Sequence, residues 1–126
     1  MIKLSADQIK KLHQQMLDAT GGLGGICDEA LLDSALSSPL QAFGETELFP
    51  SIVAKIACIT FGIIRNHPFV DGNKRIATYA MLILFELNNI EVDFSDYDIF
   101  RIGIELASGE MDYEQLLALI SQHIII

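Results

Sequence analysis

Two neighbouring segments, residues 52–64 and 76–85, are apolar around almost the whole circumference of a helical wheel. A surface helix keeps a polar face, so an all-round apolar pattern predicts two buried helices. The short polar stretch between them is where the chain leaves the core and returns to it. Two buried helices need other elements to surround them, and this requirement constrains the fold more than any other feature of the sequence.

The remaining segments predict further helices around this pair. Serine or aspartate stands before four other helical patterns, as is typical of N-terminal caps; these residues are Ser5, Asp28, Ser95 and Asp112. Residues 40–49 fit either an exposed flap or short hairpin beside the polar stretch that joins the buried pair, or a plain loop. No repeat or linker divides the chain. We therefore expect an all-α fold, a compact single-domain bundle of about six helices spanning residues 1–126.

Charge and hydropathy exclude several classes of partner. The net charge is −9, which argues against nucleic acid, because phosphate polymers demand clustered lysine and arginine. Residues 65–75 nevertheless hold three cations and one carboxylate, a local excess that suits a small anion. The longest apolar stretch is too short to span a bilayer, and we expect no signal peptide, because residues 1–7 lack its apolar core and cleavage site. We expect a cytoplasmic protein with no membrane partner.

The stretch from His67 to Arg75 contains the groups needed for phosphoryl or nucleotidyl transfer. Histidine exchanges protons near neutral pH, so His67 is the candidate general base. Asp71 suits Mg²⁺, which typically takes one or two carboxylates together with substrate phosphates. Free amides at the start of the next helix attract anions. The candidate phosphate site therefore comprises Gly72, Asn73, Lys74 and Arg75.

Other polar residues have weaker claims to a functional role. Arg65 either faces the phosphates or caps the C-terminus of its helix, where cations are favoured. His13 and His123 are distant from this stretch in sequence, and we expect surface or helix-end positions for both. The central stretch itself also has a plainer interpretation, a loop that only holds an anion or a partner without catalysis.

The sequence His67-Pro68-Phe69-Val70-Asp71-Gly72-Asn73-Lys74-Arg75 closely resembles the central motif of the Fic/Doc superfamily, HPFx(D/E)GN followed by a variable residue and arginine. Residues 21–29 and 32–36 are similar to the early region of its death-on-curing (Doc) toxin branch. The chain length is also close to that of a minimal family domain.

The resemblance implies an all-helical fold that binds ATP with Mg²⁺ and modifies a hydroxyl group on a target protein. Carried over by position, His67 is the general base and Asp71 is the Mg²⁺ ligand. Residues 72–75 form the anion site, and Phe69 packs into the core and positions the loop.

The sequence departs at two positions from the pattern of AMP-transferring Fic enzymes, and these positions bear on whether AMP or phosphate is transferred. AMP-transferring Fic enzymes usually have glycine at the position of Lys74 and a second arginine at the position of Thr78. The Doc branch shares the Asn-Lys-Arg form, which implies a kinase that transfers the γ-phosphate to a translation elongation factor, EF-Tu. Pro68 and Gly72 match the Fic form of the motif more closely than the Doc form, so AMP transfer stays an alternative. No inhibitory (S/T)xxxE(G/N) helix is present, and the Doc branch implies restraint by a separate cognate antitoxin.

Overall fold

A computed structural model describes residues 1–126 and contains six α-helices. In chain order they are α1 (Ala6–Thr20), α2 (Glu29–Ser37), α3 (Ile52–Asn66), α4 (Asn73–Leu87), α5 (Asp96–Ser108) and α6 (Tyr113–His123). A short 3₁₀ turn, η1 (Ser38–Leu40), follows α2. The expected all-α bundle of about six helices is confirmed.

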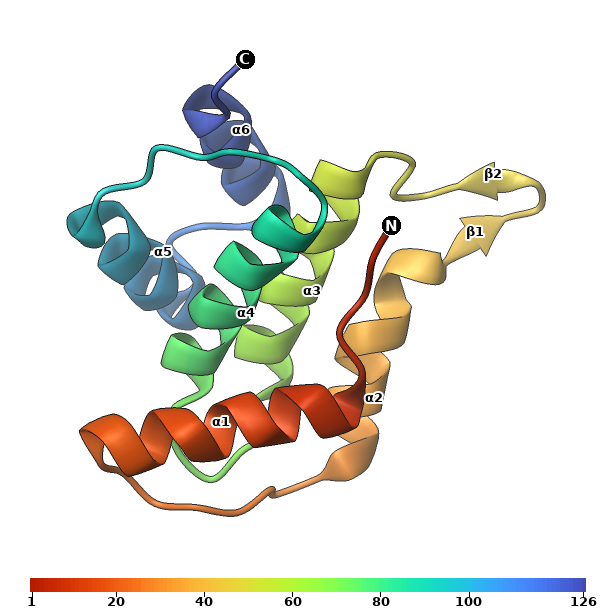
Figure 1. Ribbon diagram of the computed structural model, residues 1–126. Helices are drawn as coiled ribbons and strands as arrows, with labels where there is room; N and C mark the ends of the chain where they lie inside the picture. The colour runs from red at the N-terminus through yellow and green to blue at the C-terminus, as the bar shows by residue number, and fades with distance from the viewer.

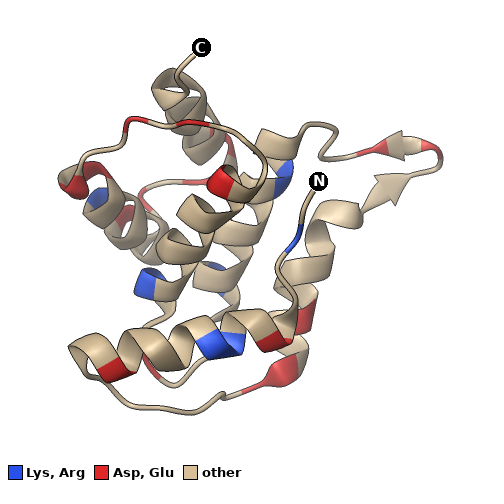
Figure 2. Ribbon diagram, in the orientation of Figure 1, with Lys and Arg blue, Asp and Glu red and all other residues tan.

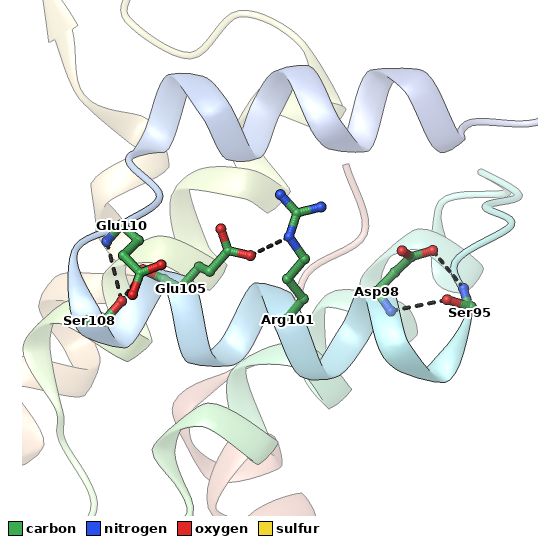
Figure 3. A network of polar contacts seen from close by, with 6 residues as sticks. All are labelled: Ser95, Asp98, Arg101, Glu105, Ser108 and Glu110. Carbon is green, nitrogen blue, oxygen red and sulfur yellow. Dashed lines mark hydrogen bonds and ion pairs between the residues drawn. The ribbon is translucent and has the colours of Figure 1, made fainter.

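Local capping accounts for where the helices begin. Ser5 and Asp112 each form a reciprocal capping box at the start of α1 and α6. Figure 3 shows the same arrangement on α5: the amide of Asp98 donates to Ser95 Oγ (3.1 Å), and the Asp98 carboxylate accepts from the Ser95 amide (2.9 Å). Arg101 pairs with a glutamate one turn further along α5. The capping boxes satisfy amides that have no partner within the helix.

The central helix pair forms the core, as the apolar pattern predicts. α3 packs against α2, α4, α5 and α6, while α1 lies across the pair and contacts α4 and α2 (Figure 1). Ile56, Ile63, Ile76 and Met81 are fully buried within one hydrophobic cluster of 20 residues. This packing fixes the two ends of the loop that joins α3 to α4, and that loop lies beside α1.

The segment between η1 and α3 is a small hairpin, one of the two forms expected for residues 40–49, but its expected place beside the polar stretch is wrong, because the hairpin leads into the N-terminal end of α3 and the polar stretch follows its C-terminal end. Strands β1 (Ala42–Phe43) and β2 (Thr46–Glu47) pair antiparallel and project away from the helices (Figure 1). Phe43 is 84% exposed.

The surface is mainly acidic. Figure 2 shows aspartate and glutamate distributed over most elements, whereas basic positions include the N-terminal end of α4 and the adjacent end of α3. The local positive charge expected around residues 65–75 therefore falls at the α3–α4 connection. None of the helices combines the length and apolarity that crossing a membrane would require.

Candidate functional site

The α3–α4 connection begins with a backbone conformation that is unusual for a side-chain-bearing residue. His67 ends α3 in the left-handed region (φ 52°, ψ 55°), and only one other non-glycine residue in the chain has a positive φ. This conformation costs about 1–2 kcal/mol for a non-glycine residue, and such strain is concentrated at functional sites. The turn leaves the His67 side chain exposed, with no hydrogen bond to the rest of the chain.

Phe69 and Asn73 hold the loop from inside. Phe69 is 2% exposed and lies in the hydrophobic cluster. The side chain of Asn73, 4% exposed, accepts from the Phe69 amide and donates to the Phe69 carbonyl, both at 2.9 Å. Because both the oxygen and the nitrogen of the Asn73 side chain are bonded inside the loop, the group that Asn73 offers to an anion is its backbone amide at the start of α4.

The glycine-rich segment before α2 supports the loop from outside. The amide of Cys27 donates to the Pro68 carbonyl (2.7 Å), and the amide of Val70 donates to the Gly25 carbonyl (3.1 Å). An isolated antiparallel bridge joins Ile26 to the loop at Phe69. The loop is therefore attached on both sides, although it connects two helices over only a few residues.

A cleft of about 420 Å³ opens at this connection. Its volume lies within the range of small-molecule sites. Six of the residues predicted from the sequence line it together, along with apolar side chains from α3 and α5; the six are His67, Asp71, Gly72, Asn73, Lys74 and Arg75.

The N-terminus of α4 faces this cleft without a side-chain cap. Gly72 occupies the N-cap position in a left-handed conformation (φ 79°), and no side chain bonds the first amides of the helix. This left-handed backbone favours glycine, and a Cβ at residue 72 would also lie 2.9 Å from the flexible end of Met16, at Cε. The free amides and the positive end of the helix dipole are available to an anion.

Asp71 lies beside these amides with its carboxylate held by two hydrogen bonds. The Leu23 amide donates to Oδ2 (3.1 Å) and the Gly72 amide donates to Oδ1 (2.8 Å). These bonds, that from Leu23 foremost, keep the pKa of Asp71 below its usual range, with smaller contributions from Arg75 and His13.

The donor set restricts which metal this site can hold. No group of three or more histidine, cysteine or carboxylate side chains forms a metal cage anywhere in the chain. A single ionised carboxylate next to an anion site fits Mg²⁺, which binds proteins through one or two carboxylates and the phosphates of a substrate.

The two cations of the motif point in different directions. Arg75 reaches the C-terminal end of α1, where its Nη1 donates to Thr20 Oγ1 (2.6 Å) and to the Gly21 carbonyl (3.3 Å). The stem of Lys74 packs beside Gly103 on α5, where a Cβ at residue 103 would lie 3.4 Å from Lys74 Cβ. Both side chains are exposed and border the cleft.

Arg65 is not among the residues that line the cleft. Its guanidinium lies 5.7 Å from the ring centroid of Phe61, and it approaches Gly109 at the end of α5. Arg65 therefore lies in the last turn of α3 and outside the cleft, and its guanidinium makes no hydrogen bond to the last carbonyls of that helix.

The expectation of a surface or helix-end position for His13 is wrong. His13 is 3% exposed; its Nε2 lies 2.7 Å from the Asp71 carbonyl oxygen, and its ring stacks on Phe69 with centroids 3.9 Å apart. His123, in contrast, does end α6, where it pairs with Asp93. The missed signal was spacing, because His13 stands four residues from both Ile9 and Leu17 on the apolar stripe of α1.

Comparison with known proteins gives two findings. The sequence profile of the Fic/DOC family matches residues 3–85, which include the whole α3–α4 connection. The chain is also 30% identical over 103 residues to a protein named Toxin Doc from Mycolicibacterium smegmatis, and the aligned region covers 79% of this chain and 78% of that protein.

Proposed function

Because this chain belongs to the Fic/DOC family, we propose that it is the toxin of a toxin–antitoxin pair and acts as a protein kinase. It transfers the γ-phosphate of ATP to a hydroxyl group of a translation factor of the EF-Tu type. The observation that carries the proposal is the single cleft in which His67, Asp71 and the uncapped N-terminus of α4 lie together.

The chemistry requires a base, an anion site and charge neutralisation. His67, exposed and free of hydrogen bonds, accepts the proton of the target hydroxyl. The hydroxyl oxygen then bonds to the γ-phosphorus while the bond to the β-phosphate oxygen breaks, and ADP leaves. The first amides of α4 bind the phosphates, and Arg75 adds positive charge at their edge. Mg²⁺ held by Asp71 would neutralise phosphate charge.

The residue at position 78 supports phosphate transfer over AMP transfer. Thr78 stands where AMP-transferring relatives have a second arginine, and its hydroxyl is bonded to the carbonyls of Lys74 and Arg75. It therefore supplies no charge to an outer phosphate. AMP transfer is retained as a second candidate because Pro68 and Gly72 follow the Fic form of the motif.

An apolar groove next to the cleft is a candidate binding site for a partner antitoxin. This groove of about 410 Å³ lies between α1, α4 and α5 and shares Arg75 with the cleft. Its apolar lining includes Met16, Tyr79, Leu82 and Ile99. A cytoplasmic location follows from a target in the translation machinery.

Incubation with ATP labelled at either the α- or the γ-phosphate separates the candidates. The purified translation factor is incubated with wild-type protein, with His67→Ala, and with the control His123→Ala, whose side chain lies outside the cleft. We expect label from the γ-phosphate only, and a loss of about 10²–10⁴-fold in His67→Ala with nucleotide binding retained. Label from the α-phosphate would establish AMP transfer.

If the protein binds nucleotide but transfers label from neither phosphate to the translation factor, it is a catalytically silent binding module. Full transfer by His67→Ala would contradict the assignment of the base. Asp71→Asn tests the metal assignment, because it should abolish the response of nucleotide binding to Mg²⁺.

A further inference from the structure

His13 is a buried histidine outside the motif, yet it contacts the motif loop in two ways. We propose that His13 is a positioning residue, which holds the loop of residues 67–72 so that the Asp71 carboxylate and the first amides of α4 face the cleft. The proposal rests on the proposed function for its effect on catalysis. The contact itself rests on the structure alone.

The first contact is a hydrogen bond to the backbone of the proposed metal ligand. His13 Nε2 lies 2.7 Å from the Asp71 carbonyl oxygen. Because a carbonyl oxygen only accepts, Nε2 carries the proton in this bond. The carboxylate of Asp71 is held by the amides of Leu23 and Gly72, so the bond from His13 completes the attachment of this residue through its main chain.

The second contact is the stack on Phe69, with ring centroids 3.9 Å apart and an angle of 15° between the planes. Phe69 is the residue that anchors the loop in the core, and its backbone is bonded by Asn73. One side chain on α1 therefore touches both the buried anchor of the loop and the residue next to the N-cap of α4. A Cβ at residue 72 would lie 3.5 Å from His13 Nε2, so the ring also lies near the N-cap residue.

Groups that orient a metal ligand affect metal affinity without touching the metal. Replacing them typically costs about 10–100-fold in affinity or activity. We expect a loss of this size when His13 no longer donates to Asp71, because the main chain that carries the carboxylate loses its bond to α1 and is less firmly positioned. A histidine that only fills space would instead change stability and leave the Mg²⁺ dependence unaltered.

Three substitutions and one matched control separate these roles. His13→Phe keeps a ring to stack on Phe69 but removes the donor. His13→Gln keeps an N–H donor at nearly the reach of Nε2, whereas His13→Asn has the same amide one methylene shorter. The control is His123→Phe, because His123 also lies against a phenylalanine, Phe94, at 4.8 Å, and bonds an aspartate, but is remote from the cleft.

Two measurements on the full chain complete the test. The first is the Mg²⁺ concentration that gives half-maximal binding of ATP, together with the rate of phosphate transfer. The second is amide hydrogen exchange of residues 21–25 and 67–72, normalised to the global stability of each variant. We expect His13→Phe and His13→Asn to need about 10–100-fold more Mg²⁺ and to exchange faster in both segments. His13→Gln should recover most of the wild-type behaviour, and His123→Phe should match wild type.

Failure of this inference differs from failure of the proposed function. If wild type transfers phosphate and His13→Phe shows wild-type Mg²⁺ dependence and loop exchange, His13 does not position the loop. If wild type transfers nothing, the proposed function fails, and the exchange data alone decide the positioning role: equal exchange in His13→Phe and wild type overturns it. Should His13→Phe fail to fold, the Gln and Asn variants decide, and equal behaviour of that pair overturns the inference.

Discussion

Replacing Asn73 with alanine should destabilise the protein far more than a single polar side chain usually does. The Asn73 amide makes two hydrogen bonds of 2.9 Å to the backbone of Phe69, and both residues are almost completely buried. Alanine removes both partners and leaves an amide and a carbonyl unsatisfied in a position that water does not reach. Each such group costs about 1–3 kcal/mol.

We therefore expect Asn73→Ala to lower the free energy of unfolding by about 2–4 kcal/mol, a large part of the 5–15 kcal/mol typical of a domain. Urea denaturation followed by circular dichroism at 222 nm measures this difference directly. The matched control is Asn66→Ala, because Asn66 makes one exposed side-chain bond, to the Leu31 carbonyl at 3.0 Å. Its loss should be about 0.5–1.5 kcal/mol.

Asn73→Asp sharpens the test because it preserves the shape of the side chain. The remaining oxygen still accepts from the Phe69 amide, but the second oxygen faces the Phe69 carbonyl in place of a donor. This variant should be at least as unstable as Asn73→Ala. A loss below about 1 kcal/mol in Asn73→Ala, or one equal to that of Asn66→Ala, would refute the conclusion that this side chain holds the loop.

Further predictions concern the surroundings of the loop and the remaining helices. Gly22→Ala should weaken ATP binding in a calorimetric titration more than Gly21→Ala. Both glycines have a positive φ, but only a Cβ at residue 22 would lie close to Asp71 Oδ2, at 2.9 Å. Equal effects of the two substitutions on ATP binding would contradict this close contact. Burial raises the pKa of Tyr113 to about 12, so its neutral phenol contributes stability that is fully present below pH 10 and is lost as pH rises through about 12. Absorbance at 295 nm should show a late titration step that Tyr113→Phe removes, and persistence of that step would refute the assignment. Tyr79→Lys should weaken co-purification with the antitoxin while leaving phosphate transfer intact, and unchanged co-purification would exclude the apolar groove as its binding site.

The sequence was informative about the helices because the relevant signals are local. The all-round apolar pattern of residues 52–64 and 76–85 identified the central pair, and the caps at Ser5, Ser95 and Asp112 lie where the sequence placed them. The residues lining the cleft could also be predicted from the sequence, because His67 to Arg75 are adjacent in the chain and a loop between two buried helices keeps them together.

The sequence by itself determined which residues meet at the α3–α4 connection, since capping, proline and helical periodicity act over a few residues. Only the tertiary structure decided which side chain does what there. Asn73 faces inward to Phe69, Arg75 turns toward the end of α1, and Arg65 lies outside the cleft. His13 reaches the loop across 58 residues of sequence. Such contacts depend on how α1 packs across the central pair, and no local pattern carries that information.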